Sequence, residues 1–382
     1  MLSLAVLSCR PGTGSQFEPV RYVQDIVSDT AGHDFGILRQ ARGRGTEGAV
    51  AIIGEPETAL FLAERFLTAD RFNNITGRRA MDRLPDFAGE RISAYLDEVN
   101  APYSALTPEK GDSLREVTVR CVLAALDTAS RIRSFNADAL EPKQPAKLLV
   151  LSSTLCHKYG YADVDTLLKM ASLPLPVVTP VASLLDEAFS RPAKHLNIGV
   201  WTDPKTLESG VFAQAFEKRA AALDKDVLAT LQAFSPDGDG DLGDRFCSFL
   251  EKYFHKGTAF PLSVLCIDDY GVDVALLNRK LEEIRRMESP ETMELNKLLA
   301  PDFRFVDLTE ALTDDVYRIL RSRNLFTHDI AYPRMDAFQT EPLGTGFVFV
   351  HSVERNIPSP TLDFVRENTS VVNQYYAIQG KH

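Results

Sequence analysis

The chain has 382 residues, of which 45% are hydrophobic and 25% charged, a globular composition long enough for two or three domains. Its formal net charge of -11 argues against a nucleic-acid partner, because phosphate binding needs a clustered basic surface. No segment has the roughly 18 apolar residues that a membrane helix needs. Five scattered cysteines without metal-site spacing suit a reducing compartment. We therefore expect a soluble, cytoplasmic protein with neither nucleic acid nor membrane as partner.

The first 190 residues predict an α/β lobe in which prolines and glycines interrupt the strand and helix patterns at irregular intervals. Apolar runs and turn residues predict strands at 2–8, 34–40 and 49–53, and helices at 17–27, from Pro56, at 92–99 and from Ser113. We expect the stretch from about 55 to 140 to be a helical insertion in this lobe. Two prolines at 141–146 indicate a boundary.

From residue 147 onward the pattern is regular. Short apolar runs at 147–151, 175–178, 196–200, 263–266 and 303–306 alternate with stretches of helical periodicity. Strands that alternate with helices of this length indicate parallel sheets covered on both faces. We expect the fold class α/β, with two Rossmann-like lobes at 1–190 and 191–322. A C-terminal segment, 323–382, with a strand at 346–350, is expected to return to the first lobe.

Two motifs that could indicate a cofactor or a metal lack the necessary context. The glycines of 43–48 match GxGxxG but precede a strand-like run, whereas a dinucleotide fingerprint must open a helix. The acidic stretch 237–241 resembles a calcium loop, but Leu242 and Ser248 replace the glycine and glutamate that such a loop requires. We therefore expect no cofactor and no metal.

Polar or thiol side chains follow several of the predicted strands. Ser152-Ser-Thr-Leu-Cys-His157 follows the strand at 147–151, Thr202 to Gly210 follows 196–200, and Cys266 ends 263–266. The carboxyl ends of parallel strands share one edge of a sheet, so these turns are expected to meet at one crevice. Hydroxyl groups and free N–H groups of a helix start would suit a carboxylate. Each cysteine would precede a helix start, which lowers a thiol pKa; an inert, buried thiol is the alternative.

The turn after the first predicted strand is a further candidate. Cys9 and Gly12 lie in Cys9-Arg-Pro-Gly-Thr-Gly-Ser15, where glycines would let backbone N–H groups approach an anion. A plain turn is the alternative interpretation.

The segment Leu196-Asn-Ile-Gly-Val-Trp-Thr-Asp-Pro-Lys-Thr-Leu-Glu-Ser-Gly-Val-Phe212 resembles the start of the second lobe in the aspartate/glutamate racemase superfamily. Val264-Leu-Cys-Ile-Asp268 is similar to the strand of that family that carries its second catalytic cysteine, so that Cys266 takes this place. Aligning His157 with the family's first cysteine motif puts Ser153 at the cysteine, and Cys156 three positions later. The resemblance covers less than half of the chain.

This resemblance implies a cofactor-independent racemase or isomerase that acts on a small carboxylic or amino acid. Two thiols on opposite faces of the substrate would exchange a proton at the α-carbon. The implied catalytic residues are Cys266, Cys156 and Ser153. The implied substrate-binding residues are Ser152, Thr154, His157, Thr202, Thr206, Ser209, Gly210, Cys9 and Gly12. The expected partner is a small-molecule carboxylate, and a homodimer is left open.

Two other interpretations stay open. The chain could be a single-cysteine lyase, such as a decarboxylase, or a carboxylate-binding protein of the same fold without catalysis. It could also be another two-lobed α/β enzyme that transfers glycosyl or phosphoryl groups, in which case the motif similarity is accidental.

Overall fold

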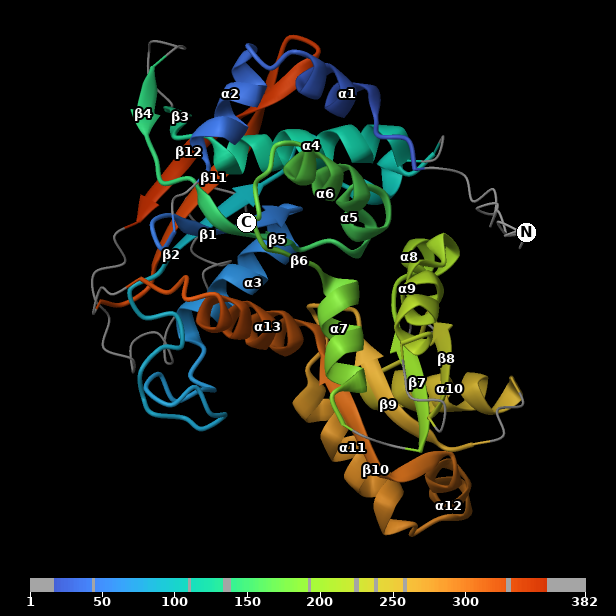
Figure 1. Cartoon of the computed structure of the whole chain (residues 1–382). Helices are drawn as coiled ribbons and strands as arrows, with labels where there is room; N and C mark the ends of the chain where they lie inside the picture. Colours follow the sequence, from blue (N-terminus) through green and yellow to red (C-terminus); the bar gives the residue numbers. More distant parts are fainter. Residues whose placement is uncertain are drawn as a thin grey trace, which may run out of the picture.

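The computed structural model describes residues 17–42, 45–108, 111–132, 139–191, 194–222, 227–236, 240–256, 260–327 and 331–355. Cys9, Gly12 and the strand expected at 2–8 lie outside these residues, as do parts of the 43–48 and 237–241 motifs. The described chain forms a larger and a smaller lobe, each built on one sheet with helices packed against it (Figure 1). The predicted α/β class with two lobes is confirmed.

The first sheet has eight strands in the order β4-β3-β12-β11-β2-β1-β5-β6. Neighbouring strands are parallel, except in the antiparallel pairs β11/β12 and β3/β4. β11 and β12 follow the second sheet in sequence, yet they pair within the first (Figure 1). The strands are β1 (Ala49–Gly54), β2 (Arg91–Leu96), β3 (Ala129–Ile132), β4 (Leu140–Pro142), β5 (Ala146–Leu151), β6 (Val177–Val178), β11 (Arg334–Leu343) and β12 (Gly346–Arg355).

The second sheet has four parallel strands in the order β10-β9-β7-β8. They are β7 (His195–Trp201), β8 (Leu228–Phe234), β9 (Leu262–Ile267) and β10 (Leu299–Asp307). A parallel pair needs a crossover connection, which helices supply in both lobes.

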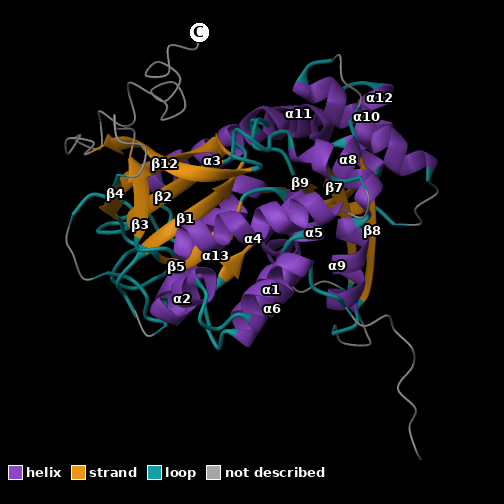
Figure 2. Cartoon of the chain, turned by 90° about the horizontal axis from the view of Figure 1, so that it is seen from above, coloured by secondary structure: helices purple, strands orange, loops and turns teal. Residues whose placement is uncertain are grey.

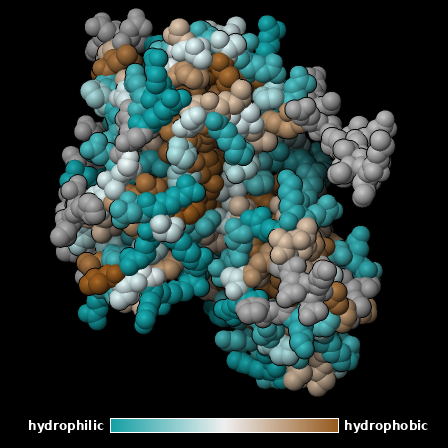
Figure 3. Space-filling model, viewed as in Figure 1, coloured by the Kyte–Doolittle hydropathy of each residue, from teal (hydrophilic) through white to brown (hydrophobic). Residues whose placement is uncertain are grey.

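Helices cover both faces of the sheets (Figure 2). In the first lobe they are α1 (Arg21–Ser28), α2 (His33–Gln40), α3 (Pro56–Thr68), α4 (Asp112–Leu126), α5 (Thr154–Tyr159), α6 (Tyr161–Met170) and α7 (Pro180–Phe189), with a 3-10 turn at Tyr103–Leu106. The later helices are α8 (Pro204–Ser209), α9 (Val211–Ala220), α10 (Leu242–His255), α11 (Val274–Arg286), α12 (Pro290–Lys297) and α13 (Leu308–Ser322). No described helix is long and apolar enough to cross a membrane, and hydrophilic residues predominate on the face shown in Figure 3.

Alternation along the strands separates two cores in the first lobe. In β1, Val50 and Ile52 pack with α3, α7 and α13, whereas Ala51 and Ile53 pack with α1, α2, α4, α5 and α6. Successive side chains of a strand point to opposite faces. The core that contains Val50 also contains residues of β7, β9 and β10, so it continues without interruption into the second lobe.

Two local predictions in the first lobe are wrong. Residues 34–40, expected as a strand, lie in helix α2, and 92–99, expected as a helix, form the central strand β2 and the turn after it. Every residue of β2 from Ile92 to Leu96 is buried, because helices cover both faces of the sheet. A continuous apolar run of this kind has no period that separates strand from helix. The stretch from 55 to 140 therefore contributes β2, β3 and part of β4 to the sheet, besides α3 and α4.

Candidate functional site

A cavity of about 860 Å³ lies between the two lobes, at the carboxyl ends of six of the described strands. The strands β1, β5, β7, β8, β9 and β10 end at this cavity, and the residues that follow them line it. This is where open parallel sheets place their ligands. The lining comprises Glu55, Glu57, Thr58, Phe61, Ser104, Ser152, Ser153, Thr154, Leu155, Trp201, Thr202, Asp203, Pro204, Thr206, Ser235, Pro236, Arg245, Asp268, Asp269, Tyr270, Gly271 and Leu308.

The first-lobe wall is fixed by contacts between the ends of β1 and β5. The backbone N–H of Ser152 donates to the carbonyl of Ile53 at 2.8 Å, and the hydroxyls of Ser152 and Thr58 lie 2.9 Å apart. A β-carbon at Gly54 would come within 1.9 Å of the Ser152 hydroxyl oxygen. Gly54 therefore allows the two strand ends to approach closely enough to hold Ser152 against the cavity.

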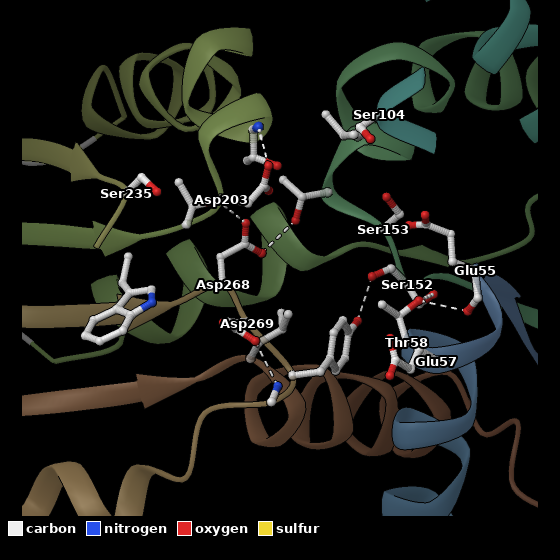
Figure 4. Close-up of a pocket in the computed structure, with 18 of the residues that line it drawn as sticks. Glu55, Glu57, Thr58, Ser104, Ser152, Ser153, Asp203, Ser235, Asp268 and Asp269 are labelled. Carbon is white, nitrogen blue, oxygen red and sulfur yellow. Dashed lines mark hydrogen bonds between the residues drawn. The ribbon is translucent and has the colours of Figure 1, made fainter. Parts of the chain in front are cut away.

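Asp268, the first residue after β9, connects the two lobes (Figure 4). Its two carboxylate oxygens accept hydrogen bonds from Thr154 of the first lobe and Thr202 of the second, each at 2.7 Å. Two residues later, the Tyr270 hydroxyl donates to the carbonyl of Ser152 at 2.7 Å. The loop after β9 thus belongs to the second lobe but makes two hydrogen bonds to the first.

The environment of Asp268 favours its neutral form. Burial raises the pKa of this carboxyl from 3.8 to about 7, outweighing the two threonine hydrogen bonds, which lower the pKa, and the charges of Asp203 and Asp269 raise it further. Both protonation states of Asp268 are therefore populated near neutral pH.

The cavity is acidic. Of the residues that the structure describes, five carboxyl groups line it, from Glu55, Glu57, Asp203, Asp268 and Asp269, against one guanidinium. Burial raises the pKa of Glu55, although the backbone N–H of Tyr103 donates to this carboxylate at 3.0 Å. The Asp203 carboxylate caps helix α8 by accepting from two of its backbone N–H groups. Within the described ranges no group of three or more His, Cys, Asp or Glu side chains is arranged to hold a metal.

Neither predicted catalytic thiol is among the residues that line this cavity. Cys266 is 0% exposed and lies inside β9, with its sulfur 3.8 Å from the carbonyl of Leu184 in α7. Because β9 continues to Ile267, the first side chain beyond the strand is Asp268. Cys156 is 1% exposed and packs in the core between α5 and α4. Burial raises the pKa of each of these two thiols to about 12, the opposite of the lowered pKa expected at a helix start.

The structure brings together most of the predicted hydroxyl residues. Ser152, Ser153, Thr154, Thr202 and Thr206 all line the cavity.

Three other predicted substrate-binding residues do not line it. His157 shares a hydrogen bond of 2.7 Å with Thr179 and stacks on Tyr161, and burial lowers its pKa to about 4. Ser209 donates to the carbonyl of Thr206, and Gly210 takes a left-handed conformation (φ 65°) between α8 and α9. Ser209 and Gly210 thus lie at the junction of α8 and α9, whereas His157 lies in α5.

Several lining residues were not predicted. Glu55 follows β1 just as Ser152 follows β5, so the rule that found the hydroxyl turns also applies to it. Asp268 is the last residue of Val264-Leu-Cys-Ile-Asp268, two positions after the predicted catalytic residue Cys266. Arg245 comes from the first turn of α10, and no local pattern marks it.

No known sequence family and no curated protein matches this chain. Among solved structures it is similar to glutamate racemase RacE1 from Bacillus anthracis, with a TM-score of 0.49 and 14% identity over 82% of this chain and 100% of the other. It is also similar to glutamate racemase from Francisella tularensis in complex with D-glutamate (TM-score 0.45, 12% identity, 78% and 90% covered). An aspartate racemase homologue from Pyrococcus horikoshii gives 0.40 and 10% identity, with 72% and 99% covered. Glutamate racemases and an aspartate racemase homologue, proteins of the family that the sequence resembles, are thus among the solved structures similar to this chain.

Proposed function

We propose that the protein binds a small amino acid in the cavity between its lobes and exchanges a proton at the α-carbon of that molecule. In this proposal two carboxyl groups, Asp268 and Glu55, take the place of the thiols. The observation that carries it is the position of Asp268, a carboxyl group with a pKa of about 7 that lines the cavity between the lobes. A general acid or base works best when its pKa lies near the working pH.

Glu55 supplies a second acid–base group on the other wall. It belongs to the first lobe, whereas Asp268 projects from the second lobe toward the middle of the site (Figure 4). Burial raises the pKa of both groups. Groups on two walls can reach two faces of one substrate carbon, which is what inversion at that carbon requires.

The reaction needs no redox partner. One carboxylate takes the proton from the α-carbon, and the electron pair of the broken C–H bond moves onto the substrate carboxylate. The other carboxyl group donates a proton to the carbon, which restores the C–H bond. Hydroxyl donors such as Ser153 and Thr206, which line the cavity, stabilise the negative charge that develops on the substrate oxygens.

The charge of the cavity favours a particular class of amino acid. Five carboxyl groups against one guanidinium attract an ammonium group and disfavour a second carboxylate on the ligand. We therefore propose amino acids with a basic side chain, such as lysine or ornithine, rather than aspartate or glutamate.

A second candidate function is ligand binding without catalysis. It is favoured by the two hydrogen bonds that Thr154 and Thr202 donate to Asp268, because they stabilise the carboxylate and so make it a weaker base.

Deuterium exchange separates the two functions. The protein is incubated in heavy water with single amino acids, and deuterium at the α-carbon is followed by NMR. We expect exchange with a basic amino acid, its loss in Asp268→Asn and Glu55→Gln, and its retention in Cys266→Ala. Binding of the amino acid without any exchange would favour the second candidate. Loss of exchange in Cys266→Ala would contradict the proposal and indicate that the Cys266 thiol transfers the proton.

A further inference from the structure

Arg245 is the one guanidinium among the described residues that line the cavity. It lies in the first turn of α10, and its Cζ is 5.0 Å from the ring centre of Trp201, the last residue of β7. Trp201 is 1% exposed, so its ring is fixed by packing. An arginine that stacks on a fixed indole keeps the plane of its guanidinium in one orientation.

The guanidinium of Arg245 has no ion pair with any part of the chain that the structure describes, although five carboxyl groups line the same cavity. Its Nε is buried and has no hydrogen-bond partner among the described residues. A buried donor without a partner costs about 1–3 kcal/mol, and a planar guanidinium offers parallel N–H groups that match a carboxylate.

We infer that Arg245, stacked on Trp201, binds the carboxylate of the ligand and so selects amino acids over amines of the same length. The inference rests on the proposed function for the identity of the ligand. One guanidinium in a cavity with five carboxyl groups suits a singly charged carboxylate, whereas a phosphate would add a second negative charge with no further cation to receive it.

The ligand then lies along the cavity with its charges separated. Its carboxylate contacts Arg245 near Trp201, and its ammonium groups face the other carboxyl groups that line the cavity, among them Glu57, Asp203 and Asp269. This orientation places the α-carbon, which is bonded to the carboxylate, on the second-lobe side, next to the loop after β9 that carries Asp268.

The test uses the fluorescence of Trp201, the only tryptophan of the chain. The full-length protein is titrated with L-lysine, with cadaverine, which is lysine without its carboxylate, and with acetate and inorganic phosphate at constant ionic strength. The variant is Arg245→Gln. The matched control is Arg120→Gln, which removes an arginine that stacks on Tyr22 at 4.0 Å and does not line the cavity.

We expect lysine and acetate to change the fluorescence of the wild-type protein. In Arg245→Gln the dissociation constant for lysine rises about tenfold or more, as expected for the loss of one charge-assisted contact, and that for cadaverine stays unchanged. Arg120→Gln binds like the wild type.

Equal weakening of lysine and cadaverine in Arg245→Gln, or a wild-type protein that responds to neither lysine nor acetate, overturns the inference. A response to phosphate that exceeds the response to acetate and depends on Arg245 overturns the choice of carboxylate. Arg245-dependent binding of lysine without α-proton exchange leaves the inference standing and removes the proposed catalysis.

Discussion

Replacing Asp268 with asparagine should make the protein more stable at neutral and alkaline pH, although it removes two hydrogen bonds to a charged group. Asparagine has nearly the same shape, and the hydroxyls of Thr154 and Thr202 can rotate to accept from the amide as well as donate to it. The substitution removes the free-energy cost of ionising a carboxyl group that is shielded from solvent.

The pKa of Asp268 sets the size and the sign of this effect. The shift from 3.8 to about 7 corresponds to about 4 kcal/mol at about 1.4 kcal/mol per pKa unit, and we expect about 2–4 kcal/mol because the group lines an open cavity. Between these two pH values the folded protein binds more protons at this site than the unfolded chain. The contribution of this site to stability is therefore complete below about pH 4 and is lost as the pH rises toward 7.

Urea unfolding of the wild type and of Asp268→Asn from about pH 4 to pH 8 measures the difference. We expect nearly equal free energies of unfolding at the acid end and a growing advantage for the variant up to neutrality. Asp269→Asn removes a charge that raises the pKa of Asp268 without touching either threonine, so it should give a smaller gain of the same sign. Parallel curves for wild type and Asp268→Asn across this range would refute the reasoning.

Three further changes test other parts of the structure. Cys266→Ala should keep α-proton exchange and cost about 1 kcal/mol of stability, because it removes one buried sulfur from a packed core; a heavy-water assay and urea unfolding measure both. Tyr270→Phe removes the hydrogen bond to the Ser152 carbonyl and should cost about 1 kcal/mol, with weaker ligand binding by calorimetry; unchanged affinity would mean that this bond does not hold the site closed. Lys147→Met leaves the carboxylate of Glu90 buried without the ammonium that lies 2.7 Å from it and should cost about 3–5 kcal/mol, part of which a second change, Glu90→Gln, should restore in thermal unfolding.

The sequence was most informative where strands and helices alternate. The runs at 147–151, 196–200 and 263–266 correspond to β5, β7 and β9, and the strand-end rule placed Ser152 and Thr202 at the cavity. The prediction from sequence was wrong at β2, because burial on both faces removes the alternation of apolar and polar residues that marks a strand.

The acid–base residues were harder to predict for a physical reason. Whether Cys266 or Asp268 reaches the cavity depends on where β9 ends, and β9 pairs with β7 and β10 through Ile267. The pairing of β9 with its neighbours and the packing of α7 over Cys266 both join residues far apart in the sequence, so no local pattern shows them. The contact of Arg245 with Trp201 likewise joins a helix and a strand that no short motif connects.

The hydrophobic core that runs from β1 and β5 into β7, β9 and β10 has a consequence for how the molecule melts. Because the same buried side chains, with α7 and α13 among them, serve both sheets, neither lobe keeps its apolar face covered when the other unfolds. The protein should therefore lose its structure in a single cooperative step, with the calorimetric and van't Hoff enthalpies in agreement. A ligand bound in the cavity then raises the melting temperature of the whole chain, including strands far from the ligand.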